Sequence, residues 1–385
     1  MGVGRFAFTP ILPMMLRDGT LDLSLAGSLA TANYVGYLVG ALLAMLMPRT
    51  WSDTAIIRLT LVSTAILTAL MAMPVREVWV ALRFLAGVVS AVGFVFTSGW
   101  CLAELSGSAG SVGSAIYTGP GAGIAMSGIA ASFMTIGGLS GSDAWIAFGT
   151  MSAALGASVW GVFRTSHKPT ELRLVSAPPG DSGRVPKAEM PLFAVAYGLA
   201  GFGYIVTATY LPVIAKSAVP DSSLLTLFWP LFGLAAVCGS LLAARIRRDT
   251  DMRLYLIGAY LVQAAGVGIS VFCHDTLGLS LSSALVGLPF TAISFFAMNE
   301  VRRIRARNHA RYMGLLTAVF AIGQIAGPPV VGIILARTAS IDTGFDLALG
   351  LAGITLVVGA AIFVAMIVLY PSEGRRSSRE VPSPR

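Results

Sequence analysis

The chain has 385 residues, of which 56% are apolar and only 11% are charged. An average soluble domain carries roughly 25% charged residues, so 26 basic and 18 acidic side chains could not cover a water-soluble protein of this size. This composition excludes a cytosolic enzyme, a nucleic-acid-binding protein and a disordered protein, although the net charge is +8. The class that remains is a membrane protein with many spans.

Twelve apolar stretches predict helices that cross the bilayer, for which roughly 20 residues are needed. In chain order they cover about residues 1–17, 24–47, 54–73, 78–102, 114–138, 144–163, 191–215, 223–244, 253–272, 277–299, 312–336 and 346–370. The three cysteines are far apart and have no metal-ligand spacing. We therefore expect an all-α membrane protein without a metal or other cofactor.

The basic residues predict the orientation of these spans. With the N-terminus in the cytoplasm, 20 of the 26 fall on the cytoplasmic side, four fall on the other side, and Arg5 and Arg83 lie within spans. Such a bias predicts that both termini are cytoplasmic. The polar stretch 164–190 predicts a flexible cytoplasmic linker between six-helix halves at 1–163 and 191–370. Residues 371–385 predict a disordered cytoplasmic tail.

The two halves show signs of an internal repeat. At an offset of 199 residues, Gly2 and Gly4 fall on Gly201 and Gly203, and Gly40 falls on Gly239. By the same offset the first helix is about eight residues shorter than the seventh, so we expect the true start to lie upstream of Met1. Small residues four apart allow helix backbones to approach closely. The candidates for such packing are Gly119, Pro120, Gly123, Gly323, Gly327 and Pro328.

Several strings carry a family resemblance. GVGRFAFTPILPMM at 2–15 and AYGLAGFGYIVTATYLPVIA at 196–215 are the most specific, and the likeness extends over nearly the whole chain. The sequence resembles the YbfB/YjiJ-type branch of the major facilitator superfamily (MFS). The resemblance implies two six-helix halves in which spans 1, 4, 7 and 10 line a central cavity. The loop motif of the superfamily is degraded here to PRTWSDTAIIR at 48–58.

Arg5 is the strongest candidate for a substrate-binding residue. A buried charge is costly, so an ionisable residue within the membrane is usually functional. If the first span extends upstream, Arg5 lies near the midplane at the depth of Tyr204, with Thr9 one turn away on the same face. If Met1 is the true start, Arg5 instead lies at the cytoplasmic edge and its side chain reaches water.

Other polar residues are candidates for lining the cavity. They are Tyr204 and Thr207 on span 7, Thr291 and Ser294 on span 10, and Asn33 and Tyr37 on span 2. Gln324 precedes the Gly-Pro pair of span 11. Hydrogen bonds between helices are the alternative interpretation of these side chains.

Three residues are candidates for coupling or gating. Arg83 and Gly87 match a pattern of the superfamily in span 4, so the resemblance implies an interior role for Arg83; extension to the outer interface is the alternative. Glu104 and Glu300 lie at the cytoplasmic ends of spans 4 and 10, and no acidic residue lies in the middle of a span. Protons are a candidate coupling ion, because proton-coupled transporters commonly use a buried carboxylate.

These features predict a monomeric secondary transporter of the inner membrane that moves a small polar or anionic molecule by alternating access. The partial match of Gly119, Pro120, Gly121 and Gly123 to the exchanger pattern slightly favours efflux. Besides the substrate and membrane lipids, we expect no nucleic-acid partner. The alternatives are a transport-inactive sensor or scaffold on the same fold, and a membrane-embedded enzyme. No phosphate-binding loop motif is present.

Overall fold

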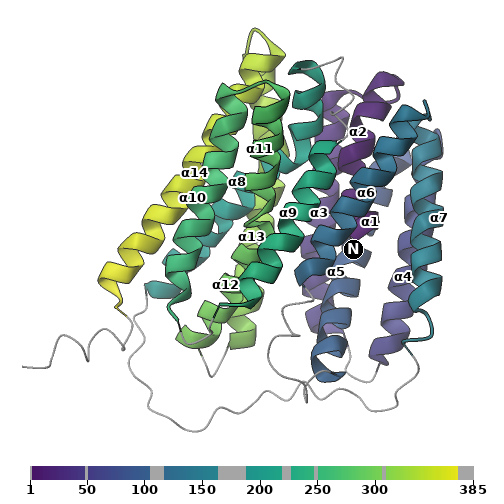
Figure 1. Ribbon diagram of the computed structural model, residues 1–385. Coiled ribbons are helices and arrows are strands. Elements are labelled where there is room, and N and C mark those ends of the chain that lie inside the picture. Colours follow the sequence, from purple (N-terminus) through teal and green to yellow (C-terminus); the bar gives the residue numbers. More distant parts are fainter. Residues whose placement is uncertain are drawn as a thin grey trace, which may run out of the picture.

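The computed structural model is a bundle of α-helices, which Figure 1 shows as a roughly parallel array. It describes residues 2–47, 51–104, 117–163, 188–218, 227–246, 250–305 and 309–371. Residues 164–187 of the predicted linker at 164–190 lie outside the described residues, whereas Glu189 and Met190 already belong to a helix. Residues 372–385 of the predicted tail at 371–385 also lie outside the described residues. The helices are α1 (Gly2–Phe6), α2 (Phe8–Arg17), α3 (Leu23–Leu46), α4 (Asp53–Leu70), α5 (Arg76–Glu104), α6 (Thr118–Ile136), α7 (Gly141–Val159), α8 (Glu189–Ala218), α9 (Phe228–Ala244), α10 (Met252–Phe272), α11 (Thr276–Gly287), α12 (Phe290–Ile304), α13 (His309–Arg337) and α14 (Ile341–Leu369).

Helix length and hydropathy agree with a protein that crosses the membrane many times. Within the described residues, nine helical segments are long and apolar enough to span a bilayer, with α11 and α12 taken together as one of them. Helix α9 is apolar but shorter. The stretches 1–17 and 144–163, which were also predicted to span, contain α1 with α2 and most of α7.

Two of the expected helices are interrupted. The first breaks at Ala7, between α1 and α2. The tenth breaks at Leu288 and Pro289, between α11 and α12. Proline has no backbone N–H to continue the helical hydrogen-bond pattern, so Pro289 explains the second break. After this break α12 runs on to Ile304, and Glu300 consequently lies within the helix rather than at its end.

Short polar side chains determine where six of the helices begin. Asp22, Ser52, Ser140, Asp251, Asp275 and Ser340 each precede a helix and accept a hydrogen bond from a backbone N–H of its first turn. Such caps satisfy donors that have no partner within the helix. Before α7 the cap is reciprocal, because Asp143 also accepts from Ser140, and these hydrogen bonds hold the pKa of Asp143 below its ordinary value.

The helix contacts in the first half of the chain recur in the second. Helix α3 packs on α5 as α9 packs on α11, α1 packs on α6 as α8 packs on α13, and α4 packs on α7 as α10 packs on α14. Between the two groups, α6 packs on α9 and α3 packs on α13. Each member of the related pair Gly40 and Gly239 faces a backbone carbonyl, of Val88 and of Leu288 respectively, where a Cβ would not fit.

The small residues of α6 differ from expectation at one position. Within the described part of the chain, Gly119 does not pack closely on another helix, because no atom lies within 4 Å of the place that its Cβ would take. The close approaches of α6 are instead made by Gly121, against the carbonyl of Gly233, and by Gly123, against the backbone of Gly2. On α13, Gly323 lies against the carbonyl of Gly198 and Gly327 against Ile205, and Pro328 lies near Gly27 of α3.

Candidate functional site

Arg5 lies inside the helix bundle, where only 5% of its surface is exposed. Its Nη2 donates a hydrogen bond of 3.2 Å to Oε1 of Gln324 on α13. Its guanidinium carbon lies 4.0 Å from the ring centroid of Tyr37 on α3, a distance typical of a cation–π contact. Arg5 therefore does not extend to water at the edge of the membrane, and it bridges helices that are far apart in the sequence.

Gln324 links Arg5 to an array of aromatic rings. Its amide nitrogen donates to the hydroxyl of Tyr204, so the carboxamide bonds helices α1, α8 and α13 together. The Tyr204 ring stacks on Phe320, at 5.7 Å between centroids and an angle of 15°, and lies 4.8 Å from Phe290. The predicted hydrogen bond between helices at Gln324 is thus present, and Arg5 and Tyr204 meet through it.

Arg83 is also inside the bundle, with 3% of its surface exposed. Its Nη2 donates to the backbone carbonyl of Arg5 at 3.3 Å, and its guanidinium carbon lies 4.8 Å from the ring centroid of Phe8. The amide of Asn33 donates to the backbone carbonyl of Arg83 at 3.0 Å. Arg83 therefore faces the interior and does not extend to the outer interface.

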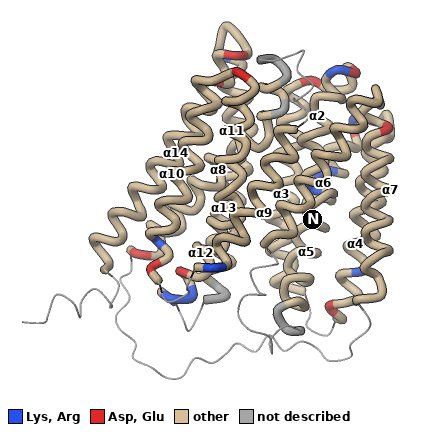
Figure 2. The backbone as a smooth tube through the Cα atoms, viewed as in Figure 1, with Lys and Arg blue, Asp and Glu red and all other residues tan. Residues whose placement is uncertain are grey.

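Among the described residues, Arg5 and Arg83 have no acidic partner. Neither forms an ion pair within the described residues, whose ion pairs involve Arg17, Arg253, His274 and Arg303. Figure 2 shows acidic residues at the two ends of the bundle and basic residues at mid-height beside α6. Among the residues that the structure describes, Nε of Arg5 and Nε of Arg83 are buried without a hydrogen-bond partner. A buried donor that lacks a partner is costly.

The remaining predicted site residues divide between this region and other contacts. Thr207 is fully buried, and its hydroxyl has no hydrogen-bond partner among the described residues, while Thr9 lies on α2 beyond the break at Ala7. Thr291 bonds to α9, through the hydroxyl of Ser240 and the carbonyl of Ala236. Ser294 accepts a hydrogen bond of 3.0 Å from the hydroxyl of Tyr197 on α8. Thr291 and Ser294 thus bond to neighbouring helices, as in the alternative interpretation.

A second charged group, which the sequence did not indicate, lies where α8, α10, α12 and α14 meet. Arg253 is completely buried and lies 2.9 Å from Asp251, 3.4 Å from Glu300 and 3.6 Å from Glu189, measured between nitrogen and carboxylate oxygen. It also donates to the carbonyl of Tyr370 at the end of α14, at 2.8 Å. The predicted coupling residue Glu300 therefore belongs to a closed ionic cluster.

Burial and the neighbouring arginines of this cluster act in opposite directions on the pKa of Asp251. Burial alone would raise the pKa of Asp251, but the hydrogen bonds and charge of Arg253 and the charge of Arg303 together hold it below its ordinary value. The other predicted coupling residue, Glu104, is the last residue of α5, and its side chain lies outside the described residues.

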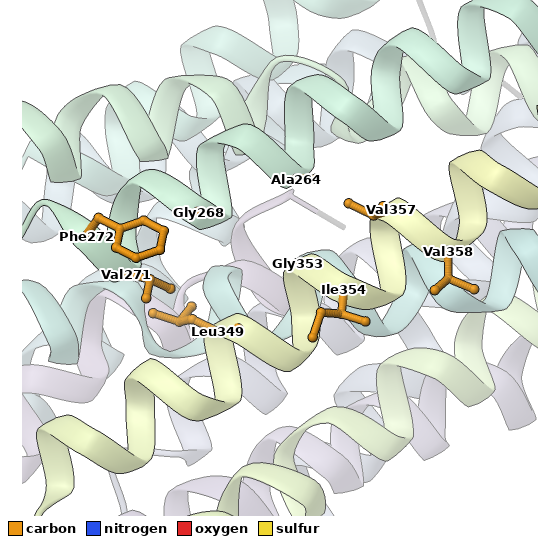
Figure 3. Close-up of a pocket in the computed structure, with 10 residues that line it drawn as sticks. Ala264, Gly268, Val271, Phe272, Leu349, Gly353, Ile354, Val357 and Val358 are labelled. Atoms are coloured by element: carbon orange, nitrogen blue, oxygen red, sulfur yellow. The ribbon is translucent and has the colours of Figure 1, made fainter.

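An apolar groove of about 350 Å³ lies between α10 and α14 (Figure 3). Its lining comes from residues such as Gly268, Phe272, Leu349 and Val357, with no polar side chain among them. This groove has no polar group that would recognise a polar substrate. Among the described residues, no three His, Cys, Asp or Glu side chains group as ligands for a metal ion.

Comparisons with known proteins agree with this fold. A family model described as "Uncharacterised MFS-type transporter YbfB" matches residues 1–364. Among solved structures, a mutant of the nucleoside transporter NupG superposes with a TM-score of 0.75 over 95% of this chain and 97% of its own. The two sequences are 14% identical, so this likeness concerns the fold alone. No curated protein shows a significant match to the sequence.

Proposed function

We propose, because the chain belongs to the YbfB family of MFS-type transporters, that it is a secondary active transporter for a small polar or anionic molecule. The observation that carries this proposal is the pair of buried arginines, Arg5 and Arg83, that has no carboxylate partner among the described residues. A charge inside a membrane protein is costly unless it is paired. An anionic substrate would supply the missing charge each time it occupies the site.

The proposed mechanism is alternating access, in which a six-helix half at 1–163 rocks against one at 191–370. The recurrence of helix contacts in the two parts of the chain supports this division. Arg5 and Gln324 belong to different halves, and their hydrogen bond crosses the boundary between them. A substrate bound there would contact both halves, so its binding would affect their relative positions.

We propose twelve spans in total, with α1 and α2 together forming the first and α11 and α12 the tenth. The excess of basic residues on one side supports cytoplasmic termini and an inner-membrane location. Efflux is slightly favoured by the Gly-Pro pattern of α6. Glu104 remains the candidate for proton coupling, because Glu300 already pairs with Arg253 and Arg303.

Flux from proteoliposomes tests this proposal. Vesicles that contain the purified protein are loaded with a library of small metabolites, and their release is followed by mass spectrometry. We expect at least one polar or anionic compound to leave faster than from vesicles without protein. If every compound leaves at the rate of the empty vesicles, the transport-inactive sensor or scaffold becomes the better explanation.

A further inference from the structure

We propose that the substrate is an aromatic carboxylate, and that its carboxylate replaces the Gln324 carboxamide as the partner of Arg5. This inference rests on the proposed function and specifies the chemistry of the same site. It follows from three properties of the region around Gln324: the two hydrogen-bonding groups that converge on its side chain, the shape of the carboxamide that they now bind, and the rings that surround it.

Two hydrogen-bonding groups converge on the end of the Gln324 side chain. Arg5 donates to its oxygen at 3.2 Å, and the Tyr204 hydroxyl accepts from its nitrogen. A tyrosine hydroxyl can also donate, and an ionised carboxylate only accepts. A carboxylate in this place would therefore accept one hydrogen bond from Arg5 and one from Tyr204, and it would neutralise the arginine.

The shape of the carboxamide also fits this exchange. A carboxamide and a carboxylate are planar groups of nearly the same size, so the space that one occupies accommodates the other. A neutral amide leaves the charge of Arg5 unpaired, whereas a carboxylate adds an opposite charge to the hydrogen bond and can accept from the guanidinium in a bidentate geometry. A substrate carboxylate is thus the stronger partner, and Gln324 holds Arg5 in position while the substrate is absent.

The surroundings favour an aromatic substrate over an aliphatic one. The Gln324 carboxamide is flanked by Tyr204, which packs on Phe290 and Phe320, and Arg5 lies on the ring of Tyr37. The array continues from Phe320 to Tyr197, with 4.7 Å between ring centroids. Aromatic pairs gain about 0.5–1.5 kcal/mol beyond the burial of their surface. A flat ring attached to the carboxylate would find ring faces from several helices beside Arg5.

Replacement of Gln324 by the anion also explains how binding would be coupled to movement. The hydrogen bond from Arg5 to Gln324 joins α1 to α13 and so bridges the two halves. When the substrate carboxylate binds Arg5, the hydrogen bond from Arg5 to Gln324 breaks, and this direct bridge between the halves is lost. The substrate carboxylate would then take the place of this bridge, because it would accept from Arg5 in one half and from Tyr204 in the other.

The test measures ligand binding to purified protein by thermal shift and by titration, with benzoate as the probe. Benzamide is the control that lacks the charge, and cyclohexanecarboxylate is the control that lacks the aromatic ring. We expect benzoate to raise the melting temperature and to bind at least tenfold more tightly than either control. Equal affinity for benzoate and benzamide would overturn the carboxylate, and equal affinity for benzoate and cyclohexanecarboxylate would overturn the aromatic ring.

Substitutions at Gln324 test the exchange itself. Gln324→Glu supplies an internal carboxylate to Arg5, so we expect at least a tenfold loss of benzoate affinity. Gln324→Leu removes the competing amide and should tighten benzoate binding several-fold, since one hydrogen bond has been lost from the unbound state. Benzoate binding by Gln324→Glu at the strength of the wild type, or weaker binding by Gln324→Leu, would overturn the proposal.

Gln263→Glu is the matched control, because Gln263 is also buried, with 1% of its surface exposed, but bonds to the carbonyl of Val286 on α11. It carries the same chemical change away from Arg5, and we expect its benzoate affinity to equal that of the wild type. Failure of the two proposals is distinguishable. Benzoate binding without flux of any compound contradicts transport, whereas flux of other compounds without benzoate binding contradicts only the aromatic carboxylate.

Discussion

Substitution of Arg253 by methionine is expected to destabilise the protein by about 3 kcal/mol. The Arg253 side chain is completely buried and lies within 3.6 Å of three carboxylates, on Asp251, Glu300 and Glu189. Methionine resembles the aliphatic part of the arginine side chain but has no charge, so these buried carboxylates would lose their shared partner. Breaking a buried ion pair costs about 3–5 kcal/mol. The lower end applies here, because Arg303 still pairs with Glu300.

Equilibrium unfolding in mixed detergent micelles, followed by tryptophan fluorescence, measures this loss. Arg253→Lys should lie between the methionine variant and the wild type, since one ammonium group cannot bond to all the oxygens around a guanidinium. Arg245→Met is the matched control, because Arg245 is exposed at the end of α9 and should change stability by at most about 0.5 kcal/mol. If Arg253→Met unfolds like this control, the cluster does not stabilise the bundle in the way described.

Three further predictions follow from the packing, the ionic cluster and the site. Gly239→Ala should destabilise by about 1–3 kcal/mol because its Cβ would meet a backbone carbonyl, whereas Gly258→Ala on α10, where the space is open, should be neutral or stabilising in the same unfolding assay. The pKa of Asp251 is lower in the folded protein than in the unfolded chain, where it is about 3.9. The ionised carboxylate of Asp251 therefore stabilises the fold fully above this unfolded pKa, and the stabilisation is lost as the pH falls through the folded pKa. The melting temperature should consequently fall less steeply with acid in Asp251→Asn than in the wild type. Arg83→Met should reduce anion flux at least tenfold, since a hydrogen bond to a charged group contributes about 1.5–3 kcal/mol, and unchanged flux would remove Arg83 from the site.

Hydropathy located the helices because each span must be apolar along its own length. Every one of the twelve predicted stretches overlaps a described helix, and Pro289 was a visible signal for the break in the tenth. The internal repeat alone was enough to predict that Arg5 and Tyr204 lie at the same depth in the membrane. Their link through Gln324 required knowledge of which face α13 presents to α1 and α8, and one sequence does not contain this information.

The ionic cluster escaped prediction for a related reason. In the sequence, Arg253 is one of several basic residues of a predicted cytoplasmic loop, and Glu189 lies at the end of the predicted linker. They become partners only because α8 and α10 begin at the place where α12 and α14 end. The carbonyl of Tyr370 also accepts a hydrogen bond from Arg253 there. In the same way, Gly119 fits a packing pattern, but the rotation of α6 turns Gly121 and Gly123 toward the neighbouring helices instead.

Exchange of labelled benzoylformate across proteoliposomes tests most directly whether Arg5 belongs to a transport site for anions. Benzoylformate is an aromatic carboxylate that crosses pure lipid slowly, because it remains ionised at neutral pH. Vesicles with the wild-type protein and internal benzoylformate should take up the label faster than empty vesicles, and vesicles with Arg5→Met should take it up at the rate of empty ones. Uptake by Arg5→Met at the wild-type rate would contradict this role of Arg5, and no uptake by the wild type would contradict the aromatic carboxylate as the substrate.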